Sequence, residues 1–109
     1  MISEVYLHNK KDAFDAVAEY YGNKIIVKKG SRIRDRLVSK FKGGKAVKRY
    51  RQDMEYVSED YILTKDCVFD SPSTAAKFVT GCNVNGYNAW KLENGMSLGD
   101  FLRKKSIRQ

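Results

Sequence analysis

Positive charge is concentrated in one short part of this chain. Between Lys24 and Arg51 the sequence has twelve Lys or Arg residues and a single acid, Asp35, so this segment alone has a formal charge of +11. The whole chain of 109 residues has a formal charge of +8, so the remainder is slightly acidic. Charge separated in this way creates a field with a direction, which favours an anionic partner over a general role in solubility.

The rest of the composition is typical of one folded domain. Hydrophobic residues make up 42% of the sequence and aromatic residues 12%, which distinguishes it from a disordered basic tail. A chain of this length has room for one core, so we expect a single domain over residues 1–109, with a basic tail at 103–109. No apolar run approaches the roughly 20 residues that span a bilayer, and no secretory signal is visible. We therefore expect a cytoplasmic protein without a membrane partner.

The first part of the chain predicts short strands. Residues 5–7 form an apolar patch that is typical of an edge strand. Residues 16–21 fit either a helix or a strand, but the turn sequence Gly22-Asn23 and the β-forming segment 24–28 favour a strand hairpin. Two more short strands are expected, over residues 61–63 and 67–69.

Two helices are expected within the basic segment. The apolar positions of the first share one helical face: Ile33, Leu37, Val38 and Phe41. Three cations recur every four residues on another face and predict a basic stripe: Arg32, Arg36 and Lys40. Gly43-Gly44 ends this helix. The second helix has its apolar positions in a narrow arc: Val47, Tyr50, Met54 and Val57.

The second half contains the clearest helix signal. Ser71 is a good N-cap, Pro72 suits the first helical position, and Gly81 is placed for a left-handed C-terminal cap. A strand is expected at 87–91, and the capping-box sequence at 97–100 begins a last helix. Together these elements predict an α+β fold, with a small, mainly antiparallel sheet packed with three or four short helices.

Residues for catalysis are scarce. His8 is the single histidine, the acids are scattered, and the glycines form neither a Walker A loop nor a dinucleotide fingerprint. Cys67 and Cys82 lack the further ligands that a zinc site needs, and free thiols are favoured over a disulfide. We expect no catalytic residue, no metal and no cofactor.

The basic segment supplies the main candidates for binding phosphates. Lys and Arg neutralise phosphates and release condensed counterions, so a nucleic acid is the favoured partner. The candidate residues are Lys28, Lys29, Arg32, Arg36, Lys40, Lys42, Lys45, Lys48, Arg49 and Arg51. The alternative is a solvated face that nearby acids neutralise, namely Asp53, Glu55, Glu59 and Asp60.

Two further groups of residues have both a functional and a structural interpretation. Ser71 and Ser73, with Lys77 one turn later, could hold a phosphate at a helix start, or the serines could simply cap the helix. Asn83, Asn85 and Trp90 could contact bases, together with neighbouring Tyr87 and Asn88. The structural alternative for this second group is turn chemistry for the amides and a core position for Trp90.

Residues 63–91 resemble a small bacterial domain family of uncharacterised function. The family signature F-x-S-P-S-x-A-A matches Phe69 to Ala76, and later parts match Gly81, Asn85-Gly86 and Trp90. With the strand that ends in Gly30-Ser31, the resemblance covers about residues 13–102. Such domains occur at the C-terminus of GIY-YIG nuclease-type proteins and in restriction-modification contexts, and they are similar to RAMA domains, for which reading of modified DNA has been proposed. Tyr87 and Cys82 depart from the usual family residues.

The resemblance implies an accessory module for DNA recognition. Combined with the charge pattern, it predicts a non-catalytic protein that binds nucleic acid, most readily duplex DNA, in a restriction, defence or mobile-element setting. The alternative is a module that docks an acidic protein, such as a restriction or nuclease subunit. A third possibility is a small metal-dependent nuclease.

Overall fold

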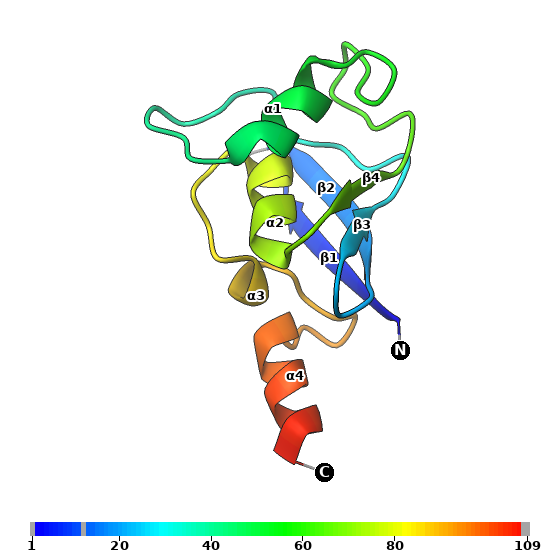
Figure 1. Cartoon of the computed structure of the whole chain (residues 1–109), viewed down its shortest axis with the longest axis vertical. Helices are drawn as coiled ribbons and strands as arrows, with labels where there is room; N and C mark the ends of the chain where they lie inside the picture. Colours follow the sequence, from blue (N-terminus) through cyan, green and yellow to red (C-terminus); the bar gives the residue numbers. More distant parts are fainter. Residues whose placement is uncertain (1, 12, 108–109) are drawn as a thin grey trace.

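A computed structural model describes residues 2–11 and 13–107. Its strands form a four-stranded antiparallel sheet in which the strand order follows the chain (Figure 1). The strands are β1 (Ser3–Asn9), β2 (Phe14–Tyr20), β3 (Ile25–Val27) and β4 (Cys67–Phe69). The helices are α1 (Gly44–Gln52), α2 (Pro72–Thr80), α3 (Gly86–Ala89) and α4 (Leu98–Ile107). The expected α+β class is confirmed.

The basic segment lies within one long connection of the sheet. The hairpin predicted from residues 16–28 is present as β2 and β3, in which Ala18 pairs with Val27. β3 then pairs with β4, although residues 28–66 separate the two strands in the sequence. This connection contains α1 and passes over one end of the molecule (Figure 1). Most of the Lys and Arg residues of the basic segment therefore lie outside the sheet.

Helix α2 covers one face of the sheet, and local signals define both of its ends. The Ser71 hydroxyl accepts a hydrogen bond from the Thr74 N–H at 3.2 Å, and Pro72 occupies the first turn. Gly81 adopts a left-handed conformation with φ of 68° and closes the C-terminus. The predicted helix over 72–80 is confirmed because its start and stop depend on neighbouring residues alone.

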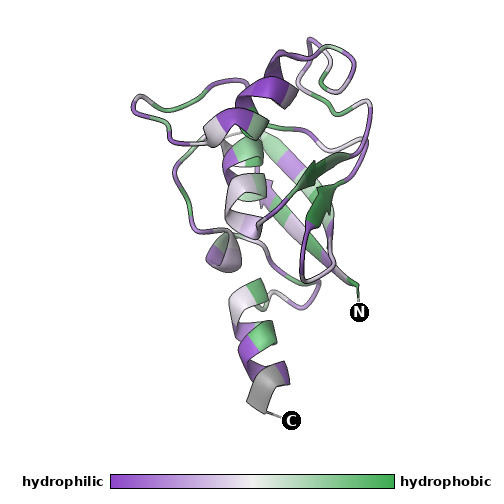
Figure 2. Cartoon of the chain, in the orientation of Figure 1, coloured by the Kyte–Doolittle hydropathy of each residue, from purple (hydrophilic) through white to green (hydrophobic). Residues whose placement is uncertain are grey.

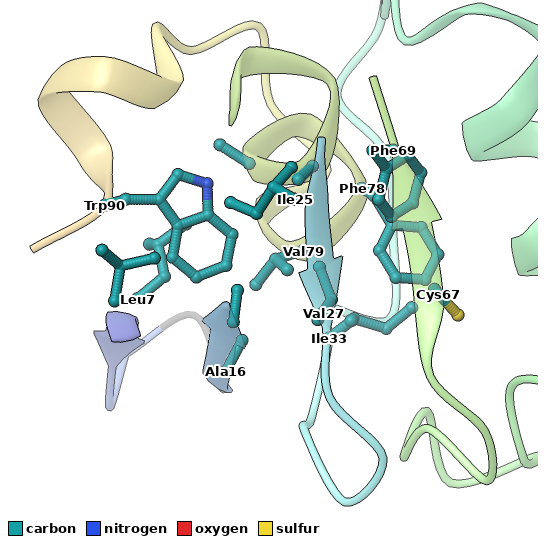
Figure 3. Close-up of a cluster of buried hydrophobic side chains, with 14 of the residues drawn as sticks. Leu7, Ala16, Ile25, Val27, Ile33, Cys67, Phe69, Phe78, Val79 and Trp90 are labelled. Atoms are coloured by element: carbon teal, nitrogen blue, oxygen red, sulfur yellow. The ribbon is translucent and has the colours of Figure 1, made fainter. Parts of the chain in front are cut away.

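The core lies between the sheet and α2 (Figure 3). Alternate residues of β2, such as Ala16 and Ala18, point inward and are fully buried. Phe69 and Phe78 pack with ring centroids 4.9 Å apart. Trp90 closes the core beyond α2, with no exposed surface. Burial of these large apolar side chains is the main stabilising contribution to the fold.

The helix expected from the apolar positions Ile33, Leu37, Val38 and Phe41 is not formed. The basic helical stripe of Arg32, Arg36 and Lys40 is therefore absent. The Arg34 and Val38 N–H groups donate instead to the carbonyls of Val79 and Gly81, at 2.8 and 2.9 Å. Lys40 also has a left-handed φ of 63°, which breaks any helical course. Contacts with the end of α2 thus override the apolar periodicity of this segment.

Other boundaries also differ from the predictions. Helix α1 ends at Gln52, and Met54, which was expected on its apolar face, is 65% exposed. The strand expected at 87–91 is replaced by the short helix α3, and residues 61–63 make isolated bridges rather than a strand. The tail predicted at 103–109 is helical as far as Ile107, and its last two residues lie outside the described part of the chain.

Candidate nucleic-acid interface

Residues 34–51 gather at one end of the molecule, which we call the basic end. It contains eight cations and one acid: Arg34, Arg36, Lys40, Lys42, Lys45, Lys48, Arg49 and Arg51, with Asp35. The loop and α1 occupy the end of the long axis opposite to α4 (Figure 1), and α1 is mainly hydrophilic (Figure 2).

The loop of the basic end is held in place by the chain that leaves α2. In addition to the backbone bonds from Arg34 and Val38, the Asn83 amide contacts the loop twice. Its Oδ1 accepts from the Lys42 N–H at 2.8 Å, and its Nδ2 donates to the Lys40 carbonyl at 3.1 Å. Lys77 of α2 donates to the Lys42 carbonyl at 3.2 Å, so its ammonium group joins the same end. The loop therefore has a defined course along α2.

Helix α1 is anchored by its inner face. Val47 is fully buried, and the Tyr50 ring packs edge-on against Phe69 and Phe78, with centroid distances of 5.3 and 5.9 Å. The Arg51 guanidinium donates to the Phe78 carbonyl at 2.8 Å, which satisfies a carbonyl near the end of α2. Burial lowers the pKa of Arg51 to about 10. Arg51 thus joins α1 to α2 instead of facing a ligand.

The outer face of α1 is polar and open to solvent. Lys45, Lys48, Arg49 and Gln52 follow the i, i+3, i+4, i+7 spacing and are all exposed. Lys45 and Arg49 also line a hollow beside the start of α2, together with Thr74 and Asp70. This arrangement directs three cations and one amide outward from a firmly held helix.

Few acids oppose this charge. Among the described residues, the one ion pair that involves the basic end joins Arg36 to its neighbour Asp35, at 3.4 Å and largely exposed. Such an exposed pair contributes little to stability. Of the acids expected to neutralise the segment, Glu55 pairs with Lys65, and the Asp53 carboxylate accepts from the Glu55 N–H. Masking by ion pairs with residues 53–60 is therefore not observed in the part of the chain that the structure describes.

Three predicted cations lie away from the basic end. Lys28 pairs with Asp66 and Glu19, at 3.0 and 3.5 Å. The Lys29 N–H donates to Asp66 at 2.8 Å, and this bond, with the Lys28 ammonium, lowers the pKa of the Asp66 carboxyl. Arg32 makes backbone bonds to Asp15, next to the β1–β2 hairpin. The predicted segment 28–51 is thus divided between two places.

The start of α2 is occupied by other parts of the protein. The Ser71 hydroxyl caps the helix, and the Ser73 hydroxyl accepts from the Gly86 N–H at 2.9 Å. Gly86 lies so close that a Cβ added there would be 2.1 Å from the Pro72 carbonyl oxygen. Helix α3 therefore covers the position where a phosphate was expected, and the two serines have structural roles.

Residues that were predicted to contact bases also have structural roles. Trp90 has no exposed surface, and its Nε1 donates to the Pro72 carbonyl at 3.0 Å. It cannot stack on a base, so that expectation is wrong and the core interpretation is correct. The Asn85 side chain caps α3 through the Tyr87 N–H at 2.9 Å, and Asn83 holds the basic loop. The amides therefore organise the backbone.

Two residues, one in the basic end and one directly after it, were not among the sequence candidates. Arg34 is half-buried, and its guanidinium donates to the Cys82 sulfur at 3.4 Å. Gln52 completes the outer face of α1, a position that its spacing of seven residues from Lys45 could have indicated. Both cysteines are free thiols, as favoured, and Cys67 is buried while Cys82 is half-buried.

The described residues form neither a metal-binding cluster nor a membrane-spanning helix. Within residues 2–11 and 13–107, no group of three or more His, Cys, Asp or Glu side chains could hold a metal ion. Across the same residues, no helix has the length and apolar character needed to cross a membrane.

Fold and surface together define a small α+β module with one strongly cationic end. A family model described as a domain of unknown function (DUF4357) matches residues 5–102, and the chain therefore belongs to the DUF4357 family. Neither a curated protein nor a solved structure matches the chain. The match covers the sheet, the basic end, α2 and α3, and thus the whole core.

Proposed function

We propose that this protein is a non-catalytic module that binds duplex DNA through the basic end. The observation that carries the proposal is the outer face of α1, where Lys45, Lys48 and Arg49 are exposed without an acidic partner among the described residues. The loop beside it adds Arg36, Lys40 and Lys42, all exposed. A surface of this kind suits the evenly spaced phosphates of a duplex.

Resemblance to restriction-associated and RAMA-like domains supports the same function. It suggests an accessory role beside a restriction or nuclease protein, in which this module supplies affinity for DNA and the partner supplies the chemistry. The helix agrees with such a role because its own residues include exposed cations and an amide but no carboxylate.

The expected salt dependence follows from the number of exposed cations. Each phosphate contact contributes about −0.9 to the slope of log affinity against log salt, so six contacts give a slope near −5. Doubling the salt concentration should then weaken binding about 30-fold.

Fluorescence anisotropy with a labelled duplex of about 20 base pairs, at about 50 and 100 mM salt, tests this proposal directly. Polyglutamate of similar length is the control for an acidic protein partner. We expect tight, salt-sensitive binding to DNA and at least tenfold weaker binding to polyglutamate. Absent binding, salt-insensitive binding, or equal affinity for the polypeptide would contradict the proposal, and the last result would favour docking of an acidic protein.

A further inference from the structure

We propose that α1 is a reading helix that places its outer face in the major groove of B-form DNA. This inference rests on the proposed function and assigns a more specific ligand, a B-form duplex whose bases are contacted through the groove. Three observations support it: the anchoring of α1, the chemistry of its outer face and the placement of the loop cations.

Helix α1 is anchored firmly enough to enter a groove without rearrangement of the protein. Val47, Tyr50 and Arg51 fix its inner side on α2 and β4, as described above. Its nine residues span about 13 Å at 1.5 Å per residue, and an α-helix with side chains is about 10–12 Å wide. The major groove of B-form DNA is about 12 Å wide and accepts one helix.

The outer face carries side chains that can distinguish bases. Arginine can bond the O6 and N7 acceptors of guanine, and glutamine can bond the N6 and N7 groups of adenine. Arg49 and Gln52 are neighbours at i, i+3 on this face, and the Gln52 side chain makes no hydrogen bond with any described residue. The outer face of α1 therefore presents two adjacent groups that can bond base edges as well as phosphates.

The loop cations complete the interface on the phosphate backbone. Lys40 and Lys42 are exposed in the loop that leads into α1, and Asn83 fixes the backbone of both residues. Contacts of this type orient a protein on the duplex but do not read its sequence. A double-stranded RNA would not fit, because the major groove of an A-form helix is too deep and narrow for side chains to read.

Selection from a random pool of 20-base-pair duplexes tests the inference, because base reading enriches a sequence and backbone binding does not. We expect an enriched motif with the wild-type protein. Gln52→Ala, which removes no charge, should change the motif at one or two positions. Asn88→Ala, which removes an exposed amide from α3 on another part of the surface, is the matched control and should leave the motif unchanged.

The enriched duplex then allows the groove to be identified. Replacing its guanines and adenines by 7-deaza analogues removes the N7 acceptors and leaves the backbone charge intact. We expect at least fivefold weaker binding to this duplex and at least tenfold weaker binding to the RNA duplex of the same sequence. Gln52→Ala should bind the normal duplex at least threefold more weakly than wild type and the 7-deaza duplex as well as wild type does.

The two proposals fail in different ways. If binding is salt-sensitive but no motif is enriched, or if the 7-deaza and RNA duplexes bind as tightly as normal DNA, the reading helix is refuted and the DNA-binding function stands. If no duplex binds at low salt, both proposals are refuted.

Discussion

The packing of the loop of the basic end against α2 can be tested by comparing two glycines. Gly81 and Gly95 both have a left-handed backbone, with φ of 68° and 89°. They differ in their surroundings. A Cβ added at Gly81 would lie 2.2 Å from the Arg36 carbonyl oxygen, whereas a Cβ at Gly95 would meet nothing within 4 Å. Substitution by alanine therefore separates the cost of backbone strain from the cost of steric overlap.

The expected magnitudes follow from these two differences. A left-handed alanine costs about 1 kcal/mol relative to glycine, and this is the whole effect expected for Gly95→Ala. Gly81→Ala adds an overlap with backbone atoms, which costs about 1–3 kcal/mol more and gives a total of about 2–4 kcal/mol. A domain of this size has about 5–15 kcal/mol of stability, so both variants should remain folded in the absence of denaturant.

Urea unfolding followed by fluorescence gives the comparison, because Trp90 is the single tryptophan and is fully buried. With a slope of about 2 kcal/mol per molar urea, the midpoint should fall by about 0.5 M for Gly95→Ala and by about 1–2 M for Gly81→Ala. Equal midpoints for the two variants would refute the close packing of the loop of the basic end on the end of α2.

Three further predictions concern other parts of the core and surface. Trp90→Phe leaves the carbonyl that it bonds unsatisfied and should cost about 1–3 kcal/mol of stability, with no change in DNA affinity. Burial raises the pKa of Cys67 to about 12, so iodoacetamide at pH 8 should label Cys82 and spare Cys67 until urea is added. The pKa of Asp66 is lowered in the folded protein, so its contribution to stability is present at neutral pH and lost as the pH falls below about 4.

Each of these predictions has a result that would contradict it. For the tryptophan, a weakened duplex affinity in a folded variant would place the ring at the interface. For the cysteines, equal labelling in the native state would show that Cys67 is accessible. For Asp66, the stabilities of wild type and Asp66→Asn can be compared by urea unfolding between pH 7 and 3. The difference in unfolding free energy between the two proteins should shrink as the pH falls. A difference that stays constant would contradict the prediction.

The fold was predictable where local chemistry decides the structure. Ser71, Pro72 and Gly81 define α2 through their own conformational preferences, and Gly22-Asn23 defines the β2–β3 hairpin in the same way. The helix expected at 33–41 failed because its N–H groups bond to carbonyls at 79 and 81, which are distant in the sequence. Periodicity alone contains no information about such a competing partner.

The candidate site was predictable in charge but not in arrangement. The density of Lys and Arg located the surface, yet it could not show that Lys28 would pair with Asp66 or that Arg51 would bond the Phe78 carbonyl. It also could not show that α3 would cover the start of α2. These assignments depend on tertiary contacts, so the sequence overstated the number of cations that are free to bind a ligand.

In the proposed function, the exposed cations of α1 act together on one duplex. The direct test is the salt slope of DNA binding for the triple variant Lys45→Gln, Lys48→Gln and Arg49→Gln. A control variant removes the same charge from exposed lysines away from the basic end: Lys24→Gln, Lys91→Gln and Lys104→Gln. We expect a slope near −5 for wild type and control and about −2 to −3 for the α1 variant, at about 0.9 per contact. Equal slopes for the two variants would show that net charge, and not the α1 surface, determines binding.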